Sequence, residues 1–215
     1  TPFVAVPGHP SGRGTAADQP TSVPAAKRQP PRTSGLSAVL CVVVSMQRSA
    51  GSNAASVRLA TIDDAPAIMA IYNVEVEKHL STFDLVPRTI DGQREWLAQR
   101  SGAFSAVVAV VDDTVVGFAS LSPYKERAAY RTTVEDSVYV SREHPRSGIG
   151  RILMDHVIGI ARDSGFHTII ARIETSGAAS RALHEACGFE LVGIEREVGR
   201  KFNRWLDVAV MQLLL

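Results

Sequence analysis

The spacing of apolar residues changes along the chain, and each change marks a new element. In residues 62–79 apolar side chains recur at intervals of three to four, which is typical of an amphipathic helix. The apolar positions with this spacing are Ile68, Ile71, Tyr72 and Val76. Asp63 or Asp64 is a candidate cap for this helix, and Pro66 suits its first turn.

The pattern then predicts a second helix and a series of strands. Residues 89–102 suit a helix with Thr89 or Asp91 as its cap and Gly102 at its end. From residue 104 the apolar period falls to two, as expected for strands. The later elements expected are a hairpin over 104–124 that turns at Asp112 and Asp113, a strand over 129–141, a helix over 147–165, a strand over 167–174, a helix over 178–188 and two strands over 189–199 and 205–215.

These elements predict one mixed α/β domain over residues 57–215. Residues 57–61 alternate and supply a first short strand ahead of the two helices. Strands then alternate with helices along the chain, which favours a single central sheet with helices on both faces.

Residues 1–56 differ in composition and are predicted to form a disordered, proline-rich leader. They hold seven of the eleven prolines, five basic residues and one acid, Asp18. Such a segment lacks the apolar period needed to build a core. One apolar run, residues 36–45, interrupts it and leaves two interpretations open. The leader is a targeting segment, or it is upstream sequence before a natural start at Met46.

Charge, cysteine content and hydropathy exclude several functional classes. A net charge of +1 gives no excess of positive charge of the kind that binds nucleic acid. Cys41 and Cys187 are too few and too far apart for a disulfide framework or a metal site, which favours a reducing, cytoplasmic location. No apolar run approaches the roughly 20 residues that span a bilayer. We therefore expect no metal, no nucleic-acid partner and no membrane partner.

The segment "EHPRSGIGRILM", residues 143–154, joins a predicted strand to a predicted helix through two glycines. Unpaired N–H groups at a helix N-terminus form an anion site, and Gly148 and Gly150 allow close backbone approach. Arg146 and Arg151 add positive charge. An ordinary strand-to-helix turn is the alternative. Neither a G-x-x-x-x-G-K-[ST] loop nor a G-x-G-x-x-G loop is present, which argues against the common nucleotide folds.

Several motifs in register give the domain a wider resemblance. They are "RLATIDDAPAIMAIYN", "YRTTVEDSVYV", "RSGIGRILM", "AASRALHEACGFELVG" and "KFNRWLDVAVMQL". In order and spacing these resemble the GCN5-related N-acetyltransferases (GNAT), and more narrowly the phosphinothricin and methionine sulfoximine N-acetyltransferase branch, over residues 57–214. The resemblance implies the GNAT fold, acetyl-CoA as cosubstrate, a small amine as acceptor and a homodimer. Trp205 is then expected in the core or at a dimer contact.

The resemblance also implies where acetyl-CoA binds. The family loop reads [QR]-x-x-G-x-[GA], so Gly148 and Gly150 match, but Pro145 stands at the first position and supplies no N–H. Gly177 stands where relatives usually carry asparagine. We expect these two departures to weaken coenzyme binding without abolishing it. The predicted coenzyme-binding residues are Val138, Tyr139, Val140, Arg146, Ser147, Gly148, Ile149, Gly150, Arg151 and Gly177.

Glu135 and His184 are the predicted catalytic residues. Glu135 matches the family's general base, and alternation places it with Ser137 and Tyr139 on one strand face. A surface glutamate is the alternative. His184 matches the histidine that this branch carries as the acid for the departing thiolate, with a half-buried structural histidine as the alternative. The main-chain N–H groups of Val138 to Val140 are expected to meet the oxyanion.

The acceptor's contacts are also inferred from the resemblance. Asp136 points away from Glu135 in a regular strand, but a β-bulge would re-aim it, and the sequence leaves that open. The basic side chains could equally be solvated loop charges. The predicted substrate residues are Phe83, Lys125, Glu126, Arg127, Arg131, Glu135, Asp136 and Ser137.

These inferences predict an N-acetyltransferase that moves the acetyl group of acetyl-CoA to the α-amine of a small amino acid or analogue. Methionine sulfoximine, methionine sulfone and phosphinothricin are the natural candidates. Two alternatives remain: an enzyme of the same fold that acts on a protein N-terminus or a polyamine, and an acyl-CoA-binding module with little catalysis.

Overall fold

The computed structural model of the protein describes residues 55–215. The predicted leader, residues 1–56, therefore lies outside the described residues apart from Ala55 and Ser56. Within the described part of the chain, no helix has both the length and the apolar character needed to cross a membrane.

Seven strands form one mixed sheet in the order β1-β2-β3-β4-β5-β7-β6. The strands are β1 (Ser56–Leu59), β2 (Val107–Val111), β3 (Thr114–Pro123), β4 (Thr133–Val140), β5 (Thr168–Glu174), β6 (Glu190–Lys201) and β7 (Arg204–Leu214). β4 and β5 run parallel, whereas the other neighbours in this sheet are antiparallel.

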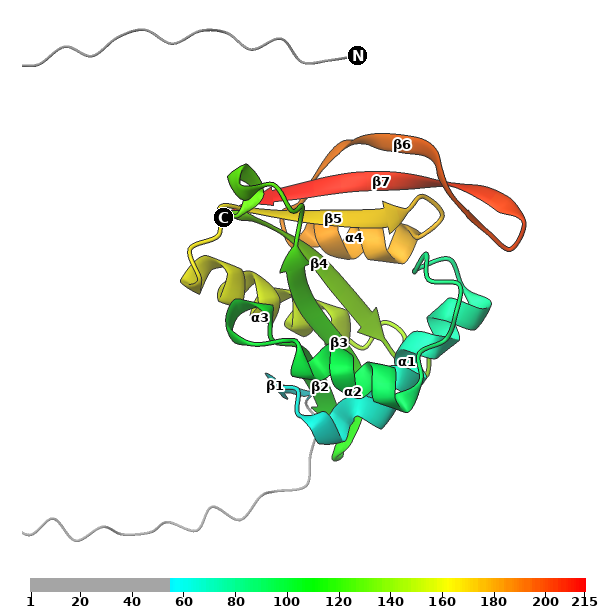
Figure 1. Ribbon diagram of the computed structural model, residues 1–215, viewed down its shortest axis with the longest axis vertical. Coiled ribbons are helices and arrows are strands. Elements are labelled where there is room, and N and C mark those ends of the chain that lie inside the picture. Colours follow the sequence, from blue (N-terminus) through cyan, green and yellow to red (C-terminus); the bar gives the residue numbers. More distant parts are fainter. Residues whose placement is uncertain (1–54) are drawn as a thin grey trace, which may run out of the picture. The chain divides into compact units, whose positions relative to one another are not determined.

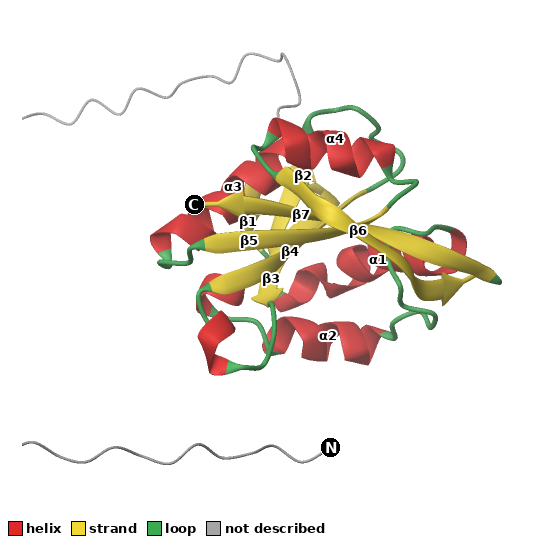
Figure 2. Ribbon diagram, turned by 90° about the horizontal axis from the view of Figure 1, so that it is seen from above, coloured by secondary structure: helices red, strands yellow, loops and turns green. Residues whose placement is uncertain are grey.

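Four α-helices cover the two faces of the sheet. They are α1 (Ala65–Lys78), α2 (Ile90–Ala98), α3 (Ile149–Asp163) and α4 (Ala178–Ala186). Figure 2 shows α3 and α4 on one face, and α1 and α2 on the other. The predicted α/β class, the order of the elements and the helices on both faces are confirmed.

Each face of the sheet has its own apolar core. Under α3 lies a cluster that includes Leu153, Val157 and Ile169, and under α1 and α2 lies one that includes Ile68 and Phe118. Alternation along the strands supplies both clusters, because successive side chains point to opposite faces. In β4, for example, Val134 is buried in the α3 cluster, so Glu135 projects toward the α1 side.

β4 and β5 separate along their length, and this divergence creates the space for a site. The two strands pair from Thr133 and Thr168 as far as Glu135 and Ile170, and no further. Beyond that point they diverge (Figure 1). β4 stays paired with β3 through Val140. The edge of β4 that faces the gap therefore has no neighbouring strand from Asp136 onward.

Local turn chemistry agrees with the sequence at some boundaries and differs at others. The hairpin turns at Asp112 and Asp113, as predicted, with φ of 47° and 59°. Thr89 caps α2, because its hydroxyl accepts a hydrogen bond of 3.1 Å from the Gly92 N–H. The predicted end of α2 at Gly102 was wrong: the helix ends at Ala98, and Gly102 begins a 3-10 turn.

The predicted side-chain cap of α1 also needs correction. Asp64 stands at the cap position, but its carboxylate makes no capping hydrogen bond to the helix. Instead it binds the Arg58 guanidinium at 2.7 and 2.8 Å and accepts from the Thr61 N–H. A charged partner on β1 therefore outcompetes the helix for this carboxylate. Pro66 lies in the first turn, as predicted.

Candidate active site

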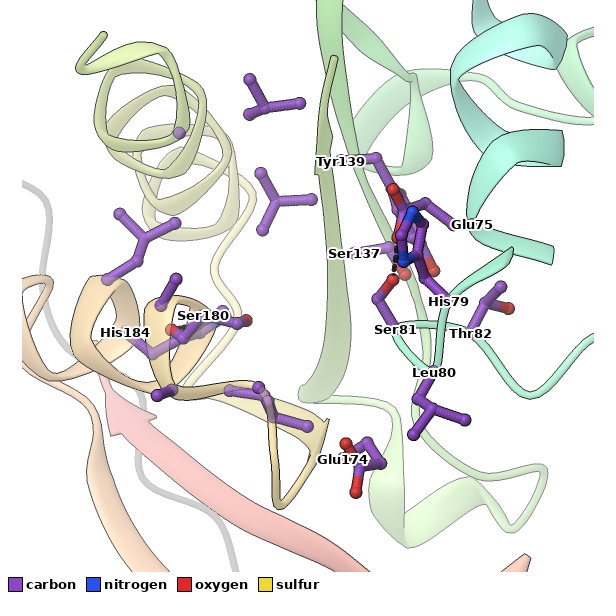
Figure 3. A pocket seen from close by; sticks show the side chains of 18 of the residues that line it. Glu75, His79, Leu80, Ser81, Thr82, Ser137, Tyr139, Glu174, Ser180 and His184 are labelled. Atoms are coloured by element: carbon purple, nitrogen blue, oxygen red, sulfur yellow. Dashed lines mark hydrogen bonds between the residues drawn. The ribbon is translucent and has the colours of Figure 1, made fainter. Parts of the chain in front are cut away.

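A cavity of about 1240 Å³ opens where β4 and β5 separate. The loop after α1, the loop between β4 and α3, the first turn of α4 and the hairpin of β6 and β7 complete its wall. Figure 3 shows Ser180 and His184 of α4 on one side of β4, with Ser137, Tyr139 and His79 on the other. The cavity thus reaches both faces of the sheet through the gap between its central strands.

The loop between β4 and α3 has the backbone shape of an anion site. Arg146 and Gly148 both adopt left-handed conformations, with φ of 54° and 80°. Within the described residues, the main-chain N–H groups from Arg146 to Gly150 donate no hydrogen bond. α3 then begins at Ile149, so its positive dipole end faces the same space. Successive free N–H groups of this kind form a concave site for phosphate oxygens.

The two arginines expected to add positive charge to this site, Arg146 and Arg151, differ in their contacts. Arg146 is exposed and lines the cavity. Arg151 instead binds Asp155 at 2.8 Å and donates to the Ala186 carbonyl at 2.7 Å, which ties α3 to the end of α4. Pro145 is exposed and contributes no N–H to the loop.

An ion pair between an exposed arginine and a buried carboxylate supports the start of the loop. Arg142 donates through Nε and Nη2 to the two Glu75 carboxylate oxygens of α1, at 2.8 Å each. Ser81 also hydrogen-bonds Glu75, whose carboxylate is buried. Burial raises the pKa of Glu75, but the bonds from Arg142 and Ser81 outweigh it and leave that pKa lowered. No local sequence pattern predicts this pair, because its two residues lie 67 positions apart in the chain.

Glu135 faces the cavity from β4 without a hydrogen-bond partner among the described residues. It shares a strand face with Ser137 and Tyr139, as alternation predicted. Burial raises the pKa of the Glu135 carboxyl, the positive charge of Arg172 opposes that rise, and Asp136 and Glu195 add to it. A half-buried carboxylate with free lone pairs and a raised pKa is suited to accept a proton.

Tyr139 and its neighbours Val138 and Val140 line the cavity. The Tyr139 ring packs against Tyr72 and Phe118, with centroids 5.1 and 5.2 Å apart. Burial raises the pKa of this phenol. Tyr139 is therefore a packed side chain of the α1 face, while the unpaired edge of β4 offers main-chain groups to the cavity.

Asp136 projects to the opposite face and binds His184. No bulge interrupts the pairing of β3 with β4, so Asp136 alternates regularly with Glu135. The His184 Nε2 lies 3.0 Å from Asp136 Oδ2, and its Nδ1 lies 2.7 Å from the Ser180 carbonyl oxygen. Both side chains are buried. Asp136 Oδ1, also buried, has no hydrogen-bond partner among the described residues.

The pair at His184 requires an extra proton. The Ser180 carbonyl only accepts, and an ionised Asp136 carboxylate only accepts, so both ring nitrogens need hydrogens. The imidazolium form satisfies both contacts. Burial lowers the pKa of His184, but the hydrogen bond and charge of Asp136, with the Ser180 carbonyl, outweigh it and leave that pKa raised. Both ring nitrogens of His184 therefore face acceptors of the chain itself.

The predicted acceptor residues separate into two groups. Phe83, Glu135, Asp136 and Ser137 line the main cavity. Lys125, Glu126 and Arg127 lie outside its lining and form a separate shallow depression with Tyr130, where the Lys125 ammonium sits 4.6 Å from the Tyr124 ring centroid. Arg131 is exposed and lines neither.

Phe83 lines the cavity and packs against Gly199 of β6. Its ring occupies the space into which a side chain at position 199 would project, so Gly199 permits this contact. Lys201, buried at the end of β6, donates to the carbonyls of Thr82 at 2.8 Å and Glu75 at 3.1 Å. These contacts fasten the loop after α1 to the hairpin of β6 and β7.

Gly177 begins α4 at its N-cap position. A Cβ at this residue would lie 3.0 Å from the Glu174 carbonyl oxygen and 3.2 Å from the Ile173 side chain. The local backbone therefore fits glycine closely, and the asparagine usual in relatives would require the turn to shift. Arg172, next to this segment on β5, also lines the cavity and was not predicted from the sequence.

Comparison with known proteins agrees with this geometry. A family model described as "Acetyltransferase (GNAT) family" matches residues 67–189. An L-methionine sulfoximine/L-methionine sulfone acetyltransferase from Pseudomonas aeruginosa is 37% identical over 163 residues, 75% of this chain and 95% of the relative.

Two solved structures are similar over the same part of the chain. One is a phosphinothricin acetyltransferase from Sinorhizobium meliloti in complex with acetyl-CoA, with a TM-score of 0.72 and 36% identity over 75% of this chain and 88% of that one. The other is a ribosomal-protein-alanine N-acetyltransferase from Brucella melitensis, with a TM-score of 0.73 and 40% identity over 74% and 99%.

The diverging central strands, the anion loop and the family match define the class of the protein: the chain belongs to the GNAT family of acetyltransferases. Within that family it is similar to N-acetyltransferases named for methionine sulfoximine, methionine sulfone and phosphinothricin. Acetyl-CoA fits the site, because the free N–H groups of the loop and the adjacent helix N-terminus suit a pyrophosphate.

Proposed function

We propose that the protein transfers the acetyl group of acetyl-CoA to the α-amine of a small amino acid or analogue, of the methionine sulfoximine, methionine sulfone and phosphinothricin type. One observation carries the proposal. A half-buried carboxylate without a hydrogen-bond partner, Glu135, faces the same cavity as the free N–H groups of the anion loop. A proton acceptor and a coenzyme anchor therefore share one space.

Glu135 acts in this proposal as the general base. An amino-acid amine is largely protonated near neutral pH, so it must lose a proton before it can attack a thioester. Glu135 has no hydrogen-bond donor of its own among the described residues, and burial raises the pKa of its carboxyl. Main-chain N–H groups on the unpaired edge of β4, around Val138 to Val140, stabilise the developing oxyanion.

His184 acts as the general acid, and Asp136 positions it. The carbonyl of Ser180 fixes the imidazole from the Nδ1 side, and Asp136 keeps a proton on Nε2. For this proton to reach the sulfur of coenzyme A as the carbon–sulfur bond breaks, the Nε2–H must leave Asp136 Oδ2, the acceptor that it faces in this structure. In this proposal the two interpretations of His184 are compatible: the buried, hydrogen-bonded histidine also serves as the proton source.

Acetyl-CoA is held in this proposal mainly by the main chain from Arg146 to Arg151. The N–H groups of Ser147 to Gly150 bind the pyrophosphate, and Arg146 adds charge from the rim of the cavity. The Arg142–Glu75 ion pair holds the loop against α1. Pro145 removes one donor, and Gly177 supplies no side chain, so we expect binding that is weaker than in relatives with the full motif.

The similarity to acetyltransferases named for methionine sulfoximine, methionine sulfone and phosphinothricin supports a small acceptor. Phe83, which packs over Gly199, and the loop fastened by Lys201 bound the cavity beside the hairpin of β6 and β7. The similarity to a ribosomal-protein-alanine N-acetyltransferase keeps a protein N-terminus as the second candidate.

Residues 57–215 are proposed to be sufficient for the activity. Every residue that lines the cavity lies between Glu75 and Val208. A chain that begins at Met46 is expected to keep full turnover; loss of turnover would assign residues 1–45 a part in the enzyme. We also propose a cytoplasmic location, where acetyl-CoA is supplied, and a homodimer formed through the exposed apolar face of β6 and β7.

Direct assay tests the proposed function. Acetyl-CoA is titrated calorimetrically, and thiol release is then followed with methionine sulfoximine, methionine sulfone, phosphinothricin, an alanine-terminated peptide and spermidine. We expect release with the amino-acid analogues. Release with the peptide or spermidine alone would move the acceptor to that class, and binding without any release would favour an acyl-CoA-binding module.

A further inference from the structure

Arg172 occupies the middle of β5, on the face of the sheet that carries Glu135. Its neighbours Ala171 and Ile173 are buried in the core beneath α3, so Arg172 projects toward the α1 side. Glu135 pairs with Ile170, and Arg172 lies two residues beyond that pair, where the strands have separated. The guanidinium therefore lies along the gap into which Glu135 also faces.

The Arg172 guanidinium is anchored but retains free donors. Its Nη2 donates to the Glu195 carboxylate of β6, and no other hydrogen bond involves this side chain among the described residues. The side chain is 38% exposed and lines the main cavity. A guanidinium carries five N–H donors in a planar fork that matches a carboxylate. Glu195 fixes one edge of the fork and leaves donors available for a ligand.

Arg172 also lies close enough to Glu135 to act on its charge. Burial raises the pKa of Glu135, and the positive charge of Arg172 is the cause that opposes it most. In an α-amino acid the carboxyl carbon stands two bonds from the nitrogen. The group that binds the acceptor's carboxylate must therefore lie near the base that serves its amine.

The basic residues predicted from the sequence are less well placed to bind the acceptor's carboxylate near Glu135. Lys125 and Arg127 line the separate depression with Tyr130, outside the lining of the main cavity. Arg131 lines neither space. Arg172 projects from the interior of a central strand, which holds a side chain more firmly than a loop does.

We propose that Arg172 binds the α-carboxylate of the acceptor and makes the enzyme prefer amino acids over amines without that carboxylate. The inference rests on the proposed function and adds a residue that determines specificity. Glu195 keeps the fork in position, so a ligand carboxylate meets an oriented cation rather than a mobile one.

The test compares L-methionine sulfone with its carboxamide, in which a neutral amide replaces the carboxylate. Kinetic constants for both acceptors are measured at saturating acetyl-CoA in the wild type, Arg172→Gln and Arg172→Lys. For the acid, Arg172→Gln is expected to raise KM by roughly ten- to a hundredfold, as expected for loss of a charge-assisted contact. For the carboxamide it should change KM by less than about threefold. The KM of Arg172→Lys for the acid should lie between those of the wild type and Arg172→Gln, because lysine keeps the charge but lacks the planar set of donors.

Arg200→Gln is the matched control, since Arg200 is exposed on β6 outside the cavity lining and faces the Trp205 ring. It should leave both acceptors unchanged, and thermal melts check that all variants fold alike. A loss that is equal for the two acceptors, or no loss, overturns the inference, as does a wild type without preference for the acid. A wild type that acetylates neither acceptor overturns the proposed function, and with it this inference.

Discussion

Glu135 shows how much of the chemistry depends on the surroundings of one side chain. Its carboxylate faces the cavity without a hydrogen-bond donor among the described residues, and burial raises the pKa of the group. A carboxylate with bound donors would be a poorer base, because hydrogen bonds stabilise its charged form. The strand context thus turns an ordinary glutamate into a candidate proton acceptor.

Replacing Glu135 with glutamine should separate catalysis from coenzyme binding. Glu135→Gln keeps the shape but cannot take a proton, so kcat should fall roughly 10²- to 10⁴-fold. The Kd for acetyl-CoA, measured calorimetrically, should stay within about twofold, because Glu135 lies apart from the anion loop. In the wild type, turnover should rise with pH as Glu135 deprotonates, with a midpoint above about 4.3. Glu190→Gln, at the exposed start of β6, is the control; turnover of Glu135→Gln equal to that of the control would remove Glu135 from the mechanism.

The Asp136–His184 pair makes a second prediction at the scale of residues. Asparagine at position 136 removes the charge that keeps the imidazole protonated, so Asp136→Asn should lower the pKa of His184 as measured by NMR titration. Turnover should fall with it. A His184 titration identical in both proteins would contradict the proposed proton donor.

The same pair links stability to pH. Because the folded-state pKa of His184 is raised, its protonated form contributes stability that is complete below the unfolded-state pKa of about 6.5. That contribution is lost as the pH rises through the folded-state pKa. Chemical denaturation of the wild type should therefore show a decline in the free energy of unfolding over this window that Asp136→Asn lacks.

Contacts of single residues also show which features of the site follow from local sequence patterns and which do not. Strand alternation correctly placed Glu135 and Ser137 on one face, because the period of two is a local property. The partner of Asp136 was not predictable, since His184 lies 48 residues further along the chain on another element. Arg172 was missed for a similar reason: only the separation of β4 and β5 exposes it to a cavity.

At the scale of elements, the loop between β4 and α3 works through its backbone. Left-handed conformations at Arg146 and Gly148 leave consecutive N–H groups unpaired, and α3 adds the positive end of its dipole. Glycine at 148 suits this conformation, whereas a side chain at Arg146 tolerates it at some cost. The loop can therefore bind an anion even though its first motif position is proline.

Pro145 gives the prediction at this scale. Pro145→Gln restores an N–H and a side-chain donor, so acetyl-CoA should bind more tightly by about 0.5–1.5 kcal/mol, or roughly two- to tenfold. Pro145→Ala is the matched control, because it restores the N–H alone. Calorimetric titration measures both. Unchanged binding in Pro145→Gln would mean that Arg146 and the remaining N–H groups already satisfy the phosphates.

Element boundaries were predicted well where the local chemistry stood alone. Thr89 caps α2, and Asp112 and Asp113 turn the hairpin, because these signals need no distant partner. Asp64 was predicted as a cap and instead pairs with Arg58, since a guanidinium from β1 competes for its carboxylate. α2 ends at Ala98, four residues before the end predicted at Gly102, and Gly102 instead begins a 3-10 turn.

At the scale of the whole molecule, element order and apolar period were enough to predict an α/β sheet with helices on both faces. Neither the strand order nor the divergence of β4 from β5 could be read from those patterns, because both depend on pairing between distant segments. The cavity exists because of that divergence. The proposed function therefore depends on the divergence of β4 from β5, which local sequence patterns do not predict.

The hairpin of β6 and β7 gives a final prediction about the assembly of the molecule. β6 is an edge of the sheet, and the hairpin exposes Leu191, Val192, Ile194, Val198 and Trp205, with Trp205 61% exposed. An edge strand that displays apolar side chains tends to pair or aggregate unless another surface covers it. A second copy would cover it through a symmetric contact.

Light scattering during size-exclusion chromatography measures this directly. The wild type should elute as a dimer at micromolar concentration, and the double substitution Val192→Lys and Trp205→Lys should shift it to a monomer. Leu59→Lys, which replaces another exposed apolar side chain on the opposite edge strand β1, is the matched control and should leave the dimer intact. If the wild type is monomeric, or the double variant still dimerises, this face is not the dimer interface. If the monomer keeps its turnover, each cavity works without the second copy; if turnover is lost with the dimer, the second copy contributes to the site.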